Sequence, residues 1–141
     1  MKLGEKYKEE HEKITDIEME MIETVPKEDY MKLFKKAEKL KSIYENHIIF
    51  EEKELFPLAK DEVPKKILEK LEKEHEKTEE LVKEIDELVS ENAAPIVLMK
   101  KLSKLRGIHS GHIHLENEYF YPILIDLNPE EAKEIIKNFE E

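Results

Sequence analysis

The chain has 141 residues, no cysteine and a formal net charge of −11, and 42% of its residues are charged. This length corresponds to one ordinary domain with its own hydrophobic core. The absence of cysteine excludes disulfides, thiolate metal sites and catalytic thiols. The acidic balance argues against nucleic acid as a partner, because binding to phosphates requires a basic face.

The N-terminal segment is too charged for a signal peptide. No run of apolar residues approaches the roughly 20 residues that a membrane span requires. We therefore expect a cytoplasmic protein that has no membrane partner.

The first predicted helix, which ends before Pro26, carries His11 on its apolar side, close to Ile14. Glu18 lies seven residues further on, about 10 Å along a helix, and the sequence assigns it no role. The second predicted helix carries His47 and Glu51, which are four residues apart and therefore share one face.

The third predicted helix, after Pro64, has His75 in a seam of apolar residues that recur at steps of three and four. The fourth, after Pro95, carries His112 and Glu116 at the same spacing as the histidine and glutamate of the second helix. Positions in the second and fourth helices correspond at a constant offset of 65 residues, which indicates an internal duplication of a helix pair.

These segments predict an all-α protein, an up-down-up-down four-helix bundle over about residues 3–125. Asn128 and Pro129 form a start signal for a short fifth helix over about residues 129–140. This helix is expected to pack across one end of the bundle. We expect residues 1–141 to form a single domain.

Six polar side chains face the predicted core at equivalent depth, and they are His11, His47, Glu51, His75, His112 and Glu116. Buried ionised carboxylates are costly unless they are paired or bound to metal. Two divalent cations bridged by Glu51 and Glu116 would balance these charges. The simplest arrangement gives one ion His11 and His47 and leaves the other two histidines to the second ion.

Two further residues lie on the ligand faces, three positions before the second-helix and fourth-helix histidines. Tyr44 and His109 could act as additional ligands, as hydrogen-bonding partners of a ligand, or as core residues. His114 is two residues from His112 and is expected at the surface.

The duplicated His…His-x3-Glu pattern, followed by Leu55-Phe56-Pro57, resembles the hemerythrin-like, or HHE cation-binding, family over roughly residues 5–125. The resemblance implies a four-helix bundle that encloses a non-haem di-iron centre with the six ligands named above. The chain departs from respiratory hemerythrins, whose third helix carries His-x3-His and whose fourth carries His-x4-Asp. Glu79 stands at the position of the second of those third-helix histidines, either as a seventh ligand or as a solvated residue.

Imidazole and carboxylate donors suit iron and manganese and are acceptable to zinc, and the resemblance favours two iron ions over manganese or zinc. The first hypothesis is a di-iron protein that binds or reduces O2, peroxide or NO; if it is an enzyme, it is an oxidoreductase. The alternative is a non-enzymatic oxygen or iron sensor, carrier or store, which as a sensor would need a partner protein. A helical bundle that holds no metal is the third hypothesis.

Overall fold

The computed structural model describes residues 3–59, 61–120 and 122–123. Four long helices account for most of this part of the chain: α1 (Leu3–Thr24), α2 (Tyr30–Phe50), α4 (Lys65–Ser90) and α5 (Pro95–Tyr119). The shorter segments are the 3-10 helix η1 (Val25–Lys27), the π-helix η2 (Glu51–Leu55) and α3 (Phe56–Ala59). The predicted all-α class is confirmed, and the predicted helix over residues 129–140 lies outside the described residues.

The helix boundaries follow the predicted breaks. Asp29 caps α2, because its carboxylate accepts a hydrogen bond from the backbone N–H of Lys32 at 3.1 Å. Pro64 immediately precedes α4, and Pro95 is the first residue of α5, where its missing N–H has no helical partner to lose.

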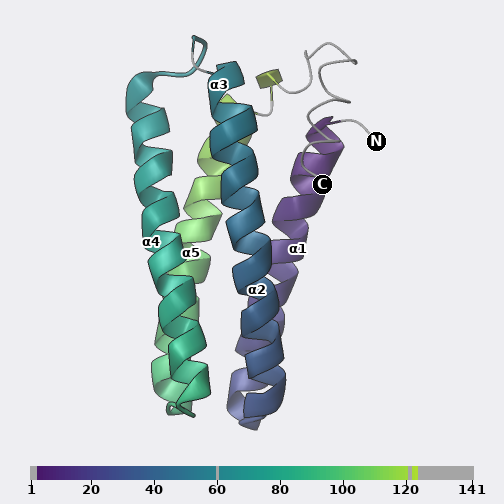
Figure 1. The fold of residues 1–141 in the computed structure, drawn as a ribbon, viewed down its shortest axis with the longest axis vertical. Coiled ribbons are helices and arrows are strands. Elements are labelled where there is room, and N and C mark those ends of the chain that lie inside the picture. Colours follow the sequence, from purple (N-terminus) through teal and green to yellow (C-terminus); the bar gives the residue numbers. More distant parts are fainter. Residues whose placement is uncertain (1–2, 60, 121, 124–141) are drawn as a thin grey trace.

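The four long helices lie side by side along the longest axis of the molecule (Figure 1). The turn from α1 to α2 and the turn from α4 to α5 lie at the lower end in this view, whereas the connection from α2 to α4 lies at the upper end. Each of α2 and α5 contacts both α1 and α4. Residues from all four helices can therefore meet on the bundle axis.

The buried apolar residues form two clusters, one at each end of the bundle. The larger cluster includes Ile14, Leu40 and Leu102, and the smaller includes Tyr7 and Phe120. Burying one such side chain contributes about 1.5–3 kcal/mol relative to leaving it in water, so the clusters hold the four helices together. Along each helix, the inward histidine lies between residues of one cluster and residues of the other.

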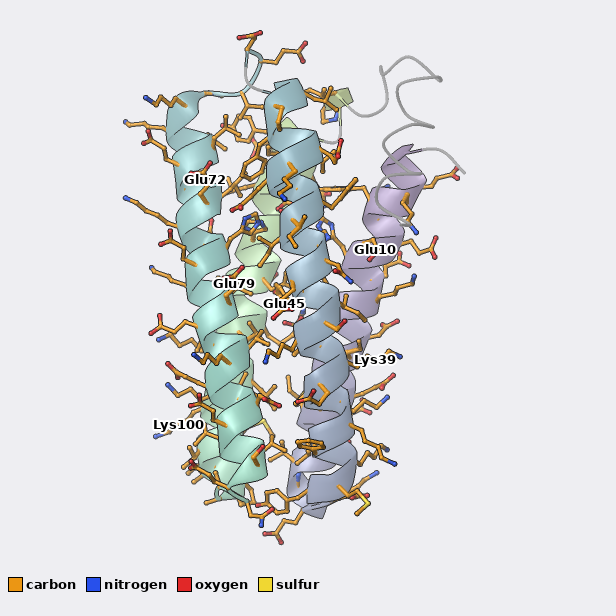
Figure 2. The ribbon with its side chains drawn as sticks, viewed as in Figure 1. Glu10, Lys39, Glu45, Glu72, Glu79 and Lys100 are labelled. Carbon is orange, nitrogen blue, oxygen red and sulfur yellow. The ribbon has the colours of Figure 1, made fainter. Side chains whose placement is uncertain are left out.

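Charged side chains cover the outward faces of the helices (Figure 2). None of the helices in the described part of the chain combines the length and the apolar character that crossing a membrane requires. The single-domain organisation over residues 1–141 stays a prediction.

Candidate metal centre

The six predicted ligands meet in one buried layer between the two apolar clusters. His11 is on α1, His75 is on α4, and α5 supplies two further members. Each of the six residues is at most 5% exposed. They are His11, His47, Glu51, His75, His112 and Glu116. The helical periodicity that places apolar residues in the core therefore also places these polar residues there.

Glu51 contacts a histidine from each of the four long helices. Its Oε2 atom lies 2.7 Å from Nε2 of His75 and 3.3 Å from Nε2 of His112. Its Oε1 atom lies 3.5 Å from Nε2 of His11 and forms a close ion pair with His47. One carboxylate therefore spans the layer with both of its oxygen atoms.

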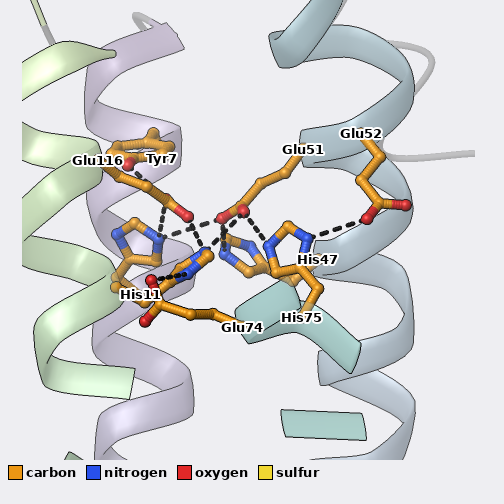
Figure 3. A network of polar contacts seen from close by, with 9 residues as sticks. Tyr7, His11, His47, Glu51, Glu52, Glu74, His75 and Glu116 are labelled. Carbon is orange, nitrogen blue, oxygen red and sulfur yellow. Dashed lines mark hydrogen bonds and ion pairs between the residues drawn. The ribbon is translucent and has the colours of Figure 1, made fainter. Parts of the chain in front are cut away.

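Glu116 reaches the same layer from α5. Its Oε2 atom lies 3.1 Å from Nε2 of His11, and its Oε1 atom forms a close ion pair with His112. The carboxylates of Glu116, at the left, and Glu51, at the right, point toward each other in the middle of the layer (Figure 3). This is the arrangement that two carboxylates need to contact the same pair of ions.

The donor atoms form two groups that share both carboxylates. One group contains His11 and His47, the other contains His75 and His112, and Glu51 and Glu116 belong to both. Within each group the donor atoms lie within 4.8 Å of one another. Ligands bound at about 2.0–2.2 Å to one ion are at most about 4.4 Å apart, so a small contraction would let each group surround an ion. The donors present in each group therefore fit a metal ion.

The electrostatics of the layer reflect the cost of burying two carboxylates. Burial opposes ionisation of Glu51, but its contacts with His47 and His11 hold the pKa of this carboxyl well below its ordinary value. Burial and repulsion from Glu51 oppose ionisation of Glu116, yet His112 keeps its pKa below the ordinary value as well. Both carboxylates are therefore negatively charged near neutral pH, the form that binds a cation.

The histidines balance this charge when no metal is bound. Burial disfavours the protonated form of His11, but hydrogen bonds to Glu116 and Glu51 outweigh it and raise its pKa to about 9. The same competition raises the pKa of His112 well above its ordinary value and raises that of His75. A metal ion that binds here must displace these protons.

Three residues beyond the predicted set hydrogen-bond or approach the ligands. The hydroxyl of Tyr7 donates to Oε2 of Glu116, and the burial of that phenol, with Glu116 beside it, raises its pKa well above the ordinary value. Glu52 accepts a hydrogen bond from Nδ1 of His75 at 3.1 Å, and Glu74 lies 4.0 Å from Nδ1 of His112. Tyr7 could have been found by its spacing of four residues before His11.

Glu18, Tyr44 and His109 form a second buried polar group next to the ligands. Glu18 is fully buried, and its Oε1 atom accepts hydrogen bonds from Nδ1 of His109 at 3.0 Å and from Arg106 at 3.2 Å. The ring of Tyr44 packs edge-on against that of His109, with centroids 5.4 Å apart. Burial lowers the pKa of His109 in spite of its bond to Glu18. Glu18, which the sequence left without a role, is therefore the partner of His109.

The remaining candidates lie outside the buried layer. Glu79 is exposed and belongs to neither donor group (Figure 2). Its position corresponds to the solvated alternative of the sequence analysis, and ligation by Glu79 stays a prediction that no contact in the structure supports. The side chain of His114 is 81% exposed, which confirms that it is a surface residue.

A comparison with protein families matches residues 3–124 to the hemerythrin HHE cation binding domain. Comparisons with curated proteins and with solved structures found no significant match. The matched residues include both donor groups and all four long helices. The chain therefore belongs to the hemerythrin HHE cation-binding domain family.

Proposed function

We propose that the protein is a non-haem di-iron protein that binds or reduces small oxygen or nitrogen species, namely O2, peroxide or NO. The observation that carries this proposal is that Glu51 and Glu116 both belong to two donor groups. Two carboxylates that bridge a pair of ions hold them close enough to act on one small ligand.

The choice of iron rests on the donors and on the family. Each donor group contains two histidines and no sulfur, and two histidines with a carboxylate are typical of non-haem Fe(II) sites that keep coordination positions open. Zinc prefers four ligands in a closed tetrahedral site, and manganese prefers oxygen donors. When bound, the two iron ions would supply the open positions and the electrons for the redox chemistry.

The residues around the layer define what can reach it. The donor groups lie between two apolar clusters, so bulk water is kept away and electrostatic interactions inside are strong. Tyr7 donates a hydrogen bond to Glu116 and fixes the orientation of that carboxylate. A small neutral molecule such as O2 or NO is the class of ligand that can enter without a costly loss of solvation.

The proposal includes the up-down-up-down order of the four long helices, which the alternating ends of the connections support (Figure 1). In that order α2 and α5 run parallel. The two His-x3-Glu pairs, His47 with Glu51 and His112 with Glu116, then approach the layer in the same sense. The duplication detected in the sequence thus accounts for two similar half-sites.

The first experiment is metal analysis of the full chain after anaerobic loading with Fe(II) and removal of unbound metal. We expect two iron ions per chain. A value of one would contradict the di-iron centre, and a value below one would contradict the metal site itself. Adding peroxide, O2 or NO to the reduced protein and following absorbance then tests the chemistry. Consumption of peroxide supports an oxidoreductase, whereas O2 that is released again under vacuum supports a carrier.

A further inference from the structure

The contact between Glu18 and His109 joins α1 to α5 directly beside the donor groups. Glu18 is 0% exposed and His109 is 2% exposed. A buried carboxylate needs a compensating partner, and Arg106 supplies only part of it, because it contacts the same Oε1 atom at 3.2 Å. The buried pair of Glu18 and His109 is therefore not an ordinary surface salt bridge, and its position beside the donor groups suggests a role there.

The hydrogen bond determines which nitrogen of His109 is available. Nδ1 faces the carboxylate of Glu18 at 3.0 Å and acts as the donor, so in the neutral ring the lone pair is on Nε2. That Nε2 atom is buried and has no hydrogen-bond partner. Histidines that bind metal commonly donate their other ring N–H to a carboxylate, which fixes the tautomer and the ring orientation.

His109 belongs to neither of the two donor groups, but its ring lies beside that of His11, a member of one of them. The ring centroid of His109 lies 6.1 Å from that of His11, and the centroids of His11 and His47 are 4.8 Å apart. With metal–nitrogen bonds of about 2.0–2.1 Å, two imidazoles on one ion have centroids roughly 4.5–6.5 Å apart. Both separations fall within this range.

We propose that Glu18 orients His109 as a further ligand of the ion held by His11 and His47. This inference rests on the proposed dimetal function and deepens it, because it makes the two ions unequal. One ion would take three imidazoles, and the ion at His75 and His112 would take two. The bond that Glu18 makes is to His109, so Glu18 is a positioning residue.

The variant His109→Asn tests the assignment. The amide nitrogen of asparagine stands close to the place of Nδ1 and can still donate to Glu18, but nothing replaces Nε2. We expect the variant to bind one Fe(II) ion as the natural chain does and the other at least about 10-fold more weakly, measured by competition with a coloured chelator. His114→Ala, which removes an exposed histidine, is the control and should bind both ions normally.

Two outcomes separate this inference from the proposed function. If the natural chain fails to bind two ions, the dimetal function is wrong. If it binds two ions and His109→Asn binds both with unchanged affinity, only the assignment of His109 is overturned.

A measurement on the natural chain decides the question even if the variant does not fold. The chain has six histidines, and 1H NMR of the Co(II)-loaded protein, in which each metal-bound imidazole gives its own strongly shifted ring N–H signal, reports how many imidazoles bind metal. Five metal-bound rings support the proposal, and four overturn it.

Discussion

At the scale of single residues, Glu51 and Glu116 have unequal roles although they occupy equivalent positions in the duplication. Glu51 contacts the inward histidines of α1, α2, α4 and α5, whereas the contacts of Glu116 are with His11, His112 and Tyr7. Both carboxylates are buried. Glu51 therefore connects the two donor groups more completely than Glu116 does, because it contacts all four of their histidines.

Replacing Glu51 by alanine should reduce iron binding more than replacing Glu116. The Glu51→Ala variant loses the one carboxylate that contacts all four histidines, so both ions lose a ligand. We expect less than one iron per chain after Fe(II) loading, measured by elemental analysis. Glu118→Ala is the matched control, because the side chain of Glu118 is 60% exposed on α5. Retention of two ions by Glu51→Ala would show that Glu51 is not a bridge.

At the scale of elements, the π-helix η2 (Glu51–Leu55) distinguishes the two halves of the bundle. Here Glu51 and Glu52, although adjacent, contact opposite nitrogens of His75, Nε2 and Nδ1. In a regular α-helix, with 3.6 residues per turn, successive side chains point about 100° apart. Glu51 and Glu52, which both contact the imidazole of His75, lie in the wider π-helical turn. Such turns are frequent at functional sites. The equivalent residue Glu116 lies in the regular helix α5.

The Glu52→Ala variant tests the importance of this contact. Without Glu52, Nδ1 of His75 loses its acceptor, and loss of such a partner typically costs about 10–100-fold in metal affinity. We expect one of the two ions to be weakened by that factor in a chelator competition assay. Glu45→Ala removes an exposed glutamate from α2 and should leave both affinities unchanged (Figure 2). If Glu52→Ala binds metal as tightly as Glu45→Ala, the contact between Glu52 and His75 does not contribute to metal binding.

The features that recur in both halves of the chain could be predicted from the sequence, whereas the π-helical turn and the bond between Glu18 and His109, which occur once, could not. The steps of three and four residues placed His75 in the core, and the duplication added the other inward ligands. The π-helical turn was not predicted, because the His-x3-Glu spacing of His47 and Glu51 is identical to that of the α-helical copy. The bond from Glu18 to His109 joins residues 91 positions apart, and no local pattern encodes such a contact.

At the scale of the whole molecule, metal binding and folding are coupled through the buried layer. The two apolar clusters hold the helices in place on either side of it. Without metal, the ionised Glu51 and Glu116 are balanced by protonated histidines, among them His11 and His112. In the proposed metal-bound state, the cations would take over that role and the protons would leave. From neutral to alkaline pH, the stability of the metal-free bundle and its affinity for metal should therefore respond to pH in opposite directions.

The metal-free protein should lose stability as the pH rises through about 9. The pKa of His11 is raised from 6.5 in the unfolded chain to about 9 in the fold, so its contribution is complete below 6.5 and disappears as the proton leaves the folded state. The lowered pKa values of Glu51 and Glu116 have the opposite sign, so their contribution disappears as the pH falls below the ordinary carboxyl range.

Metal affinity should rise over the same interval in which the metal-free fold weakens, because fewer protons remain to be displaced. The increase in melting temperature on adding Co(II) should therefore be larger at about pH 9 than at about pH 6. Thermal unfolding of the metal-free and Co(II)-loaded chain across this range measures both trends. The His11→Gln variant removes the group that titrates near 9 and should flatten the pH dependence of the metal-free protein in this range. A melting-temperature increase that is independent of pH would mean that the ions do not compete with protons for these histidines, and hence that they bind elsewhere.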